Sequence, residues 1–267
     1  MIYCYFLFCF LKYLCYFAMF IYFLTKSLIM KNLILGLIFL PICLFCQSDN
    51  DPTLFEVINI EVKPGQEKAF EAAVKAHNKK FHPEGIYAAH LYSNLNGPNG
   101  GKYTWIMGPT TFTALDSRPG EGAHDDDWKN VTAVSQETDS PRYWSSDAKL
   151  SHRVVNAANT KSLIWIYDIK PNQEARWSEL IAKVKKVYDE KRPTESFGVS
   201  WNEFSDTKAG NDVAIIFSFD KWSWMDRKSN FSKDFEEVFG AGSWHTFLNA
   251  MAETVDGRVD WLRTKVD

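Results

Sequence analysis

The chain has 267 residues, of which 46% are hydrophobic and 24% are charged, and its formal net charge at pH 7 is −3. Residues 1–47 contain three lysines and no acid, so the chain beyond them carries 27 basic and 33 acidic residues, a net charge of −6. This acidic balance excludes nucleic acid as the expected partner, because binding to phosphates needs a basic face.

The N-terminal region differs from the rest of the chain, because it holds all five cysteines. Residues 30–32 form a short basic segment, residues 33–45 are apolar, and the polar stretch "QSDND" follows. This order is typical of a secretory signal peptide. We therefore treat residues 1–47 as a signal peptide region and expect an exported protein, either periplasmic, secreted or an outer-membrane lipoprotein of a bacterium.

Two points in this region have alternative interpretations. The apolar run over residues 1–25 is either a membrane-spanning helix, since about 20 apolar residues can cross a bilayer, or a segment before the true start at Met30. Cys46 is either a lipid-anchored cysteine or a neighbour of an ordinary cleavage site. In both cases no cysteine follows position 46, so we expect a body without disulfides.

A duplicated pattern organises the remaining residues. The segments "KPGQE" from Lys63 and "KPNQE" from Lys170 each begin a helix with apolar residues at positions i, i+3, i+4 and i+11. The paired apolar positions are Phe70, Ala73, Val74 and Phe81 in the first copy, and Trp177, Leu180, Ile181 and Tyr188 in the second. The second helix is expected to be three residues longer, because the match changes from an offset of 107 to one of 110 after it.

Each half then reads strand, helix, strand, strand, helix, strand. "FEVINIEV" pairs with "LIWIYDI", "KYTWIMG" with "DVAIIFS", and "DDDWKNV" with "SKDFEEV", which places Trp128 on Phe235. We expect closing strands near residues 148–155 and 258–265. The sequence thus predicts an α+β fold of two fused ferredoxin-like βαββαβ repeats, with antiparallel sheets packed face to face. The predicted repeats span residues 53–155 and 162–267, joined by a linker at 156–161, and they form a monomer with an internal pseudo-dimer.

The element order, the duplicated turn and the paired apolar positions resemble the dimeric α/β-barrel superfamily, which includes antibiotic-biosynthesis monooxygenase-like and NIPSNAP-like proteins. The resemblance covers about residues 53–266. It implies a ligand between the sheets or in a cleft beside a helix, and an activity that ranges from cofactor-free oxygenation and haem degradation to simple binding. Haem-degrading members use an Asn, Trp and His set, and Asn59 on the first strand invites that comparison. No catalytic role is transferred, because a Trp and a His cannot be placed at matching sites.

Positions where the two copies differ are the candidates for function. His77 takes the helix position of Val184, and His90 the strand position of Ser200. Polar residues that alternate with the apolar set of the second strand are expected to face the space between the sheets. The candidate ligand-binding residues are His77, His90, Tyr92, Asn59, Trp105, Trp144 and His152, with His90 and Asn59 as the catalytic candidates. The alternatives are that His77 is an ordinary buried histidine and that the others lie on both faces of the sheet and never meet.

The stretch "AHDDDW" from Ala123 is the one segment that resembles a metal site. Its copy keeps only one of the acids, and adjacent acids at a helix start complement the helix dipole. We therefore interpret it as a helix start and expect no metal site and no cofactor, with haem as the alternative that the resemblance implies.

Two classes of function remain. The first is binding of a small apolar or aromatic molecule, or of a protein partner, without catalysis. The second is a cofactor-independent monooxygenase-like or haem-degrading-like enzyme that positions a substrate near His90 and Asn59. A pocket of several hundred cubic ångströms that contains both residues would favour the enzyme.

Overall fold

The computed structural model describes residues 51, 53–154, 159–204 and 210–266. Pro52–Asp267 form one compact unit that includes both halves of the duplicated pattern. The predicted signal peptide, the alternative start at Met30 and the alternative anchor at Cys46 lie outside the described residues, and so do residues 156–158 of the predicted linker. Within the described ranges, no helix combines the length and the apolar character needed to cross a bilayer.

The first half contains the predicted order of elements with three short additions, the 3-10 helix η1, the helix α3 and the strand β4. Its elements are β1 (Leu54–Val62), α2 (Glu67–Phe81), η1 (Gly85–Tyr87), β2 (Ala89–Asn94), β3 (Tyr103–Thr110), α3 (Phe112–Leu115), α4 (Ala123–Val134), β4 (Ser135–Thr138) and β5 (Arg142–His152).

The second half repeats this order with an additional helix. Its elements are β6 (Lys161–Ile169), α5 (Glu174–Lys191), β7 (Phe197–Asn202), β8 (Val213–Phe219), η2 (Trp222–Trp224), α6 (Phe231–Phe239), α7 (Ser243–Thr254) and β9 (Val255–Lys265). The helix α5 has 18 residues and α2 has 15, so the predicted difference of three residues is confirmed.

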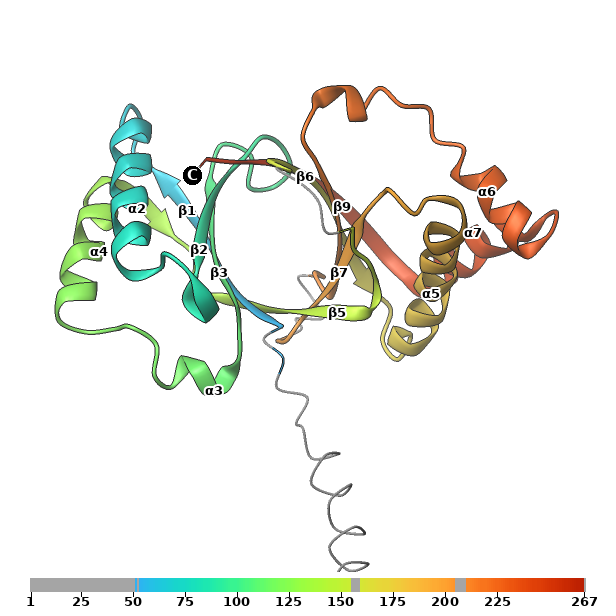
Figure 1. The fold of residues 1–267 in the computed structure, drawn as a ribbon, viewed down its shortest axis with the longest axis horizontal. Coiled ribbons are helices and arrows are strands. Elements are labelled where there is room, and N and C mark those ends of the chain that lie inside the picture. Colours follow the sequence, from blue (N-terminus) through green and yellow to red (C-terminus); the bar gives the residue numbers. More distant parts are fainter. Residues whose placement is uncertain (1–50, 52, 155–158, 205–209, 267) are drawn as a thin grey trace, which may run out of the picture. The chain divides into compact units, whose positions relative to one another are not determined.

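The two four-stranded sheets join into one closed barrel (Figure 1). In each half the strand order is that of a ferredoxin-like sheet, β5-β1-β3-β2 and β9-β6-β8-β7. The halves meet at both sheet edges, because β2 pairs with β9 and β5 pairs with β7. The predicted fold class is confirmed, and the sheets that we expected to face one another are also hydrogen-bonded along their edges.

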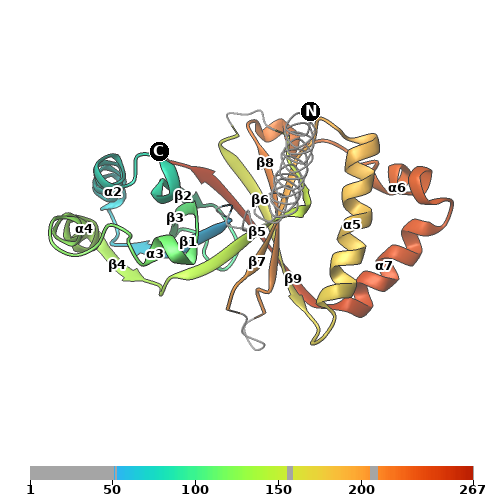
Figure 2. The same ribbon diagram turned by 60° about the horizontal axis from the view of Figure 1, so that its bottom comes forward.

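The helices cover the outside of the barrel in two groups. Figures 1 and 2 show α2 and α4 against the sheet of the first half, and α5, α6 and α7 against that of the second. Successive side chains of each strand point alternately toward the helices and into the barrel interior, as the two-residue period of a strand requires. On β8, for example, Ile215 packs in the core under the helices, whereas the next residue, Ile216, faces the barrel interior.

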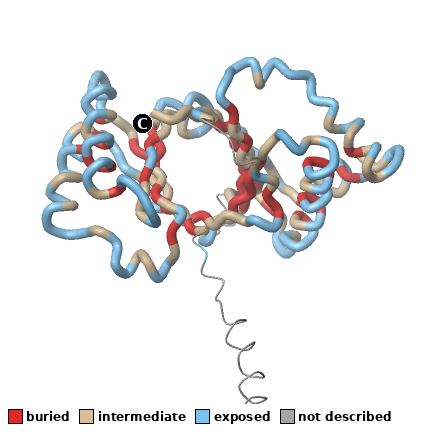
Figure 3. The backbone as a smooth tube through the Cα atoms, in the orientation of Figure 1, coloured by how far each residue is buried: buried red, intermediate tan, exposed pale blue. Residues whose placement is uncertain are grey.

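Each half has its own core between the sheet and the helices. Figure 3 shows buried residues on both the strands and the helices of each half. Phe70 and Val74 of α2 are fully buried, and so is Trp177 of α5. Burying a side chain of this size contributes about 1.5–3 kcal/mol to stability. These are the positions that the helical spacing predicted.

One predicted pairing between the halves is different in the structure. The amide of Lys63 donates to the carbonyl of Val134 at the end of α4, and that of Lys170 donates to Thr254 at the end of α7, each at 3.0 Å. By these contacts α4 corresponds to α7, and α6 is an addition of the second half. The sequence match of Trp128 with Phe235 aligned α4 with α6, because both helices have the same apolar spacing. The contacts at the helix ends show instead that α4 is equivalent to α7.

Candidate functional site

The barrel interior contains a cavity of about 270 Å³ that is lined by side chains from all eight strands of the closed ring. Its aromatic and aliphatic residues include Phe55, Tyr92, Trp144 and Trp261, with Ile164, Ile166 and Ile216. Three of the predicted ligand-binding residues, Asn59, Tyr92 and Trp144, line this cavity. The strand period therefore brings these three residues to the space between the sheets.

The charged residues that line this cavity in the described part of the chain are three arginines, Arg142, Arg153 and Arg263, with no acid among them. Gly198 leaves room for one of them, since a Cβ at that position would lie 3.1 Å from Nη2 of Arg153. Burial lowers the pKa of Arg153 and that of Arg263. The interior is thus a positively charged, aromatic space.

Two buried donors on β9 have no hydrogen-bond partner. They are Nε of Arg263 and Nε1 of Trp261, two residues apart and both lining the cavity. The Arg263 guanidinium lies 4.4 Å from the centre of the Tyr92 ring, a cation–π contact. A buried donor without an acceptor costs free energy, so this part of the cavity is suited to a ligand that accepts hydrogen bonds.

Asn59 lies at the centre of a polar network in the same interior. The Thr104 hydroxyl donates to Oδ1 of Asn59 at 2.8 Å, and Nδ2 of Asn59 donates to Asp139 at 3.2 Å. Nδ2 of Asn94 donates to the Thr104 hydroxyl at 2.8 Å. These contacts fix the Asn59 side chain, which is only 3% exposed.

A second, larger cavity of about 770 Å³ lies between the sheet and the helices of the second half. Its lining is mainly apolar, with contributions from α5, α6 and α7 and from the sheet. Arg192, Arg227 and Arg258 also line it, and each is ion-paired with a carboxylate at 3.7 Å or less.

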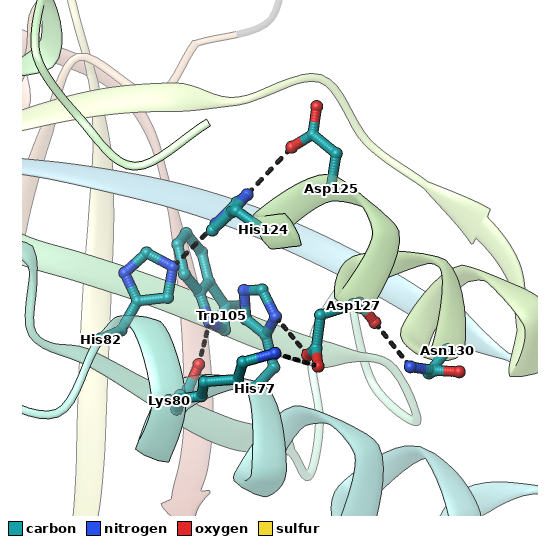
Figure 4. Close-up of polar contacts among 9 residues, drawn as sticks. His77, Lys80, His82, Trp105, His124, Asp125, Asp127 and Asn130 are labelled. Carbon is teal, nitrogen blue, oxygen red and sulfur yellow. Dashed lines mark hydrogen bonds and ion pairs between the residues drawn. The ribbon is translucent and has the colours of Figure 1, made fainter. Parts of the chain in front are cut away.

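Three histidines of the first half meet between the sheet and the helices (Figure 4). His77 lies on α2, His82 is the first residue after this helix, and His124 lies in the first turn of α4. One ring nitrogen of each lies within 4.8 Å of the other two. His77 is fully buried, His82 is 4% exposed, and the side chain of His124 is 18% exposed.

Each of these imidazoles is oriented by an oxygen at its Nδ1. His77 Nδ1 contacts Asp127 Oδ2 at 2.9 Å, and His124 Nδ1 contacts Asp125 Oδ1 at 2.9 Å. His82 Nδ1 contacts the carbonyl oxygen of Tyr87 at 2.9 Å. The opposite nitrogens, the Nε2 atoms, point into the cluster, where those of His82 and His124 are 3.2 Å apart.

Burial controls the charge of this cluster. It lowers the pKa of His77, despite the hydrogen bond with Asp127, and it lowers the pKa of His82 to about 4. The hydrogen bonds from His77 and His124 hold the pKa values of Asp127 and Asp125 below their usual range. At neutral pH, His77 and His82 are therefore neutral imidazoles and both acids are carboxylates.

The other predicted site residues do not share one site. Trp105 faces the helices, where its Nε1 donates to Oδ1 of Asn78 at 2.9 Å and its ring packs against His82. His90 is exposed on β2 and lines neither cavity. His152, at the end of β5, contacts Asp189 of α5 at 2.7 Å. The candidates thus lie on both faces of the sheet, and only Asn59, Tyr92 and Trp144 of them share the barrel interior.

Four residues of these sites were not predicted from the sequence. Arg263 and Trp261 follow the alternation of β9, which a strand pattern could have revealed. His82 stands where the aligned copy has Arg192, a third difference of the kind that singled out His77. His124 was interpreted only as part of a helix start, because nothing local indicates that it meets His77.

No protein-family model matches this chain, and no curated protein sequence matches it. Solved structures do match. A candidate monooxygenase from Fusobacterium nucleatum has a TM-score of 0.53 at 10% identity, over 80% of this chain and 92% of that one. A candidate monooxygenase from Lactobacillus acidophilus has a TM-score of 0.48 at 11% identity, over 81% and 100% of the two chains.

A chlorite dismutase from Candidatus Nitrospira defluvii, solved in complex with imidazole, matches with a TM-score of 0.49 at 9% identity, over 82% of this chain and 93% of that one. At such identities the similarity concerns the fold alone. Together with the closed ring of strands described above, the similarity to the Fusobacterium nucleatum structure shows that this chain has the dimeric α/β-barrel fold, here built from two halves of a single polypeptide.

Proposed function

We propose that the protein binds a small aromatic or apolar molecule with an anionic group inside its barrel. The observation that carries this proposal is the pair of unpartnered donors, Nε of Arg263 and Nε1 of Trp261, in a cavity lined by three arginines and no acid among the described residues. An anion would accept hydrogen bonds from these donors and neutralise a buried positive charge, which is costly when it is uncompensated.

The lining also limits the size and kind of ligand. A volume of about 270 Å³ is slightly smaller than the range for small-molecule sites, roughly 300–1,000 Å³. Trp144, Trp261 and Tyr92 provide aromatic walls, against which a planar ring can stack. These features favour a carboxylate with about one ring, such as a benzoate.

The test compares charged and uncharged ligands of the same shape. Benzoate and benzamide are titrated into the protein by calorimetry at low salt. Because hydrogen bonds to charged groups contribute about 1.5–3 kcal/mol, we expect benzoate to bind at least about tenfold more tightly. Equal affinities, or no binding of either molecule at millimolar concentration, would contradict the proposal.

Substitutions at two adjacent positions of β8 distinguish which of the two cavities holds the ligand. Ile216→Trp fills the barrel interior, whereas Ile215→Trp fills the space under the helices of the second half. We expect the first variant to lose benzoate binding and the second to keep it. The reverse result would assign the ligand to the larger cavity, whose apolar lining makes it the second candidate, for a bigger and less charged molecule.

The residues that line the two cavities do not fit haem. Among the residues that the structure describes, neither lining contains a histidine or a cysteine, the side chains that most often hold haem iron. In the larger cavity, burial raises the pKa of Tyr167 and raises that of Tyr188 to about 12, which keeps both phenols protonated. We therefore assign no haem chemistry to either cavity.

Binding is favoured over catalysis by the positions of the two catalytic candidates. Asn59 lines the barrel interior, but His90 lies outside both linings. A cofactor-independent monooxygenase would need a base beside its substrate, and the described lining residues of the interior contain no histidine or carboxylate. The fold similarity to a candidate monooxygenase keeps this activity as the alternative, which substrate-dependent oxygen consumption would reveal.

A further inference from the structure

The Nε2 atoms of the three histidines of the first half face one another, and the hydrogen-bond partners of the rings place the imidazole protons on the Nδ1 atoms instead. Nδ1 of His77 faces a carboxylate, Nδ1 of His124 faces another, and Nδ1 of His82 faces a backbone carbonyl. These oxygens can only accept hydrogen bonds, so each Nδ1 carries the proton. In a neutral imidazole Nε2 then has a lone pair.

This arrangement is unfavourable as it stands. Nε2 of His82 and Nε2 of His124 are 3.2 Å apart, and Nε2 of His77 is buried with no hydrogen-bond partner. One added proton on His124 would join it to His82 but would leave His77 unpartnered. A species that accepts electron density from three nitrogens at once satisfies the whole cluster, and a metal ion is such a species.

We propose that His77, His82 and His124 bind a divalent transition-metal ion of the zinc class through their Nε2 atoms. Imidazole nitrogens are preferred ligands of zinc, copper, iron and nickel. A tetrahedral zinc ion with Zn–N bonds of about 2.0–2.1 Å separates two ligand nitrogens by about 3.3 Å, close to the 3.2 Å between His82 and His124. Three protein ligands leave the fourth position for water or a small ligand.

The surroundings of the cluster match those of metal-binding histidines. In such sites the second ring nitrogen usually donates to a carboxylate or a backbone carbonyl, which fixes the tautomer and strengthens the ligand. Asp127 and Asp125 do this for His77 and His124 (Figure 4), and the Tyr87 carbonyl does it for His82. His124, the most exposed of the three, marks the side from which an ion enters.

Among the described residues of the second half, which has the same fold, the positions equivalent to the three histidines hold other residue types. Val184 stands at the position of His77, and Arg192 stands at that of His82. By the helix-end contacts, Trp244 takes the place of His124, and its ring packs against Phe235 and Phe247. One ion per chain is therefore expected, on the side of the sheet opposite to the barrel cavity and independent of the ligand proposed there.

The test is a titration of the full protein, freed of any affinity tag and of bound metal, with Zn²⁺ and with Co²⁺. We expect one Zn²⁺ per chain by calorimetry and the intense visible absorption of four-coordinate Co²⁺. His124→Ala should weaken Zn²⁺ binding by more than about 100-fold, beyond the 10–100-fold typical of orienting residues. His245→Ala, which removes an exposed histidine of α7, should leave the affinity unchanged.

Folding is checked separately, by comparing the thermal unfolding of the metal-free variants with that of the metal-free wild type. His77→Val, which copies the second half, provides another variant that should lose the ion and retain the fold. The proposal is overturned if the wild type binds no Zn²⁺ at millimolar free ion. It is equally overturned if folded His124→Ala and His77→Val bind Zn²⁺ as tightly as the wild type.

Discussion

His82 and His124 meet through their Nε2 atoms at 3.2 Å, although 42 positions separate them in the chain. The contact joins the end of α2 to the start of α4, and His77, one turn before the end of α2, completes the cluster. The helix pair of the first half thus holds three metal-type ligands, where its copy has an aliphatic residue, an arginine and a tryptophan.

The carboxylate behind His77 is expected to strengthen metal binding without touching the ion. Asp127→Ala removes the acceptor of the His77 Nδ1 proton, so we predict a loss of Zn²⁺ affinity of about 10–100-fold. Asp126→Ala is the matched control, because Asp126 lies on the same helix turn and pairs only with Lys129 among the described ion pairs. Competition with a zinc-binding dye measures the Zn²⁺ affinity of both variants. If both lose the same affinity, the effect comes from the removed negative charge and not from the contact between Asp127 and His77.

Metal removal should lower the thermal stability of the folded chain. An ion at 100 times its dissociation constant stabilises the native state by about 2.7 kcal/mol. For a body of this size that corresponds to an unfolding temperature about 5–10 °C higher with Zn²⁺ than with chelator. The same comparison on His124→Ala should give no difference, and a wild type that unfolds at one temperature in both conditions would contradict the metal site.

Arg263 is expected to lower the stability of the ligand-free protein and to strengthen the binding of benzoate. Arg263→Met removes a buried guanidinium whose Nε lacks an acceptor, so the unfolding temperature of the ligand-free protein should rise. Benzoate affinity should fall at least about tenfold, since a charge-assisted hydrogen bond is lost. Arg258→Met, on the same strand but beside the other cavity, is the control for binding. A stable variant that still binds benzoate with full affinity would exclude Arg263 from the site.

Asp168 gives a prediction on pH dependence. Burial raises its pKa, and the neighbouring Asp212 and Asp256 raise it further, so the carboxylate form is less favourable in the folded than in the unfolded chain. This cost is present at pH 7 and disappears below the pKa of the unfolded chain, about 3.9. Asp168→Asn should therefore raise the unfolding temperature at pH 7 and have little effect near pH 3. A shift of equal size at both pH values would point to a cause other than charge.

The fold was predictable because its signals are local and occur twice. The turns from Lys63 and Lys170 and the apolar spacing after them define two helices, and the period of the strands separates Leu91, under the helices, from Tyr92, in the interior. The pairing of β2 with β9 was not predictable, because it joins segments far apart in the chain through backbone groups that every residue carries.

The candidate site was predictable in part for the same reason. Asn59, Tyr92 and Trp144 lie on strands, where alternation fixes the direction of each side chain. His82 follows the last turn of α2, where the helical period no longer determines direction. The position of His124 depends on how α4 packs on α2, a tertiary contact that no local pattern contains.

The metal site is tested most directly by diffraction at the zinc absorption edge from crystals grown with Zn²⁺. We expect one anomalous peak per chain, about 2.0–2.1 Å from each of the three Nε2 atoms of His77, His82 and His124. A peak bound elsewhere, or three histidines seen in density with no anomalous peak among them, would contradict it.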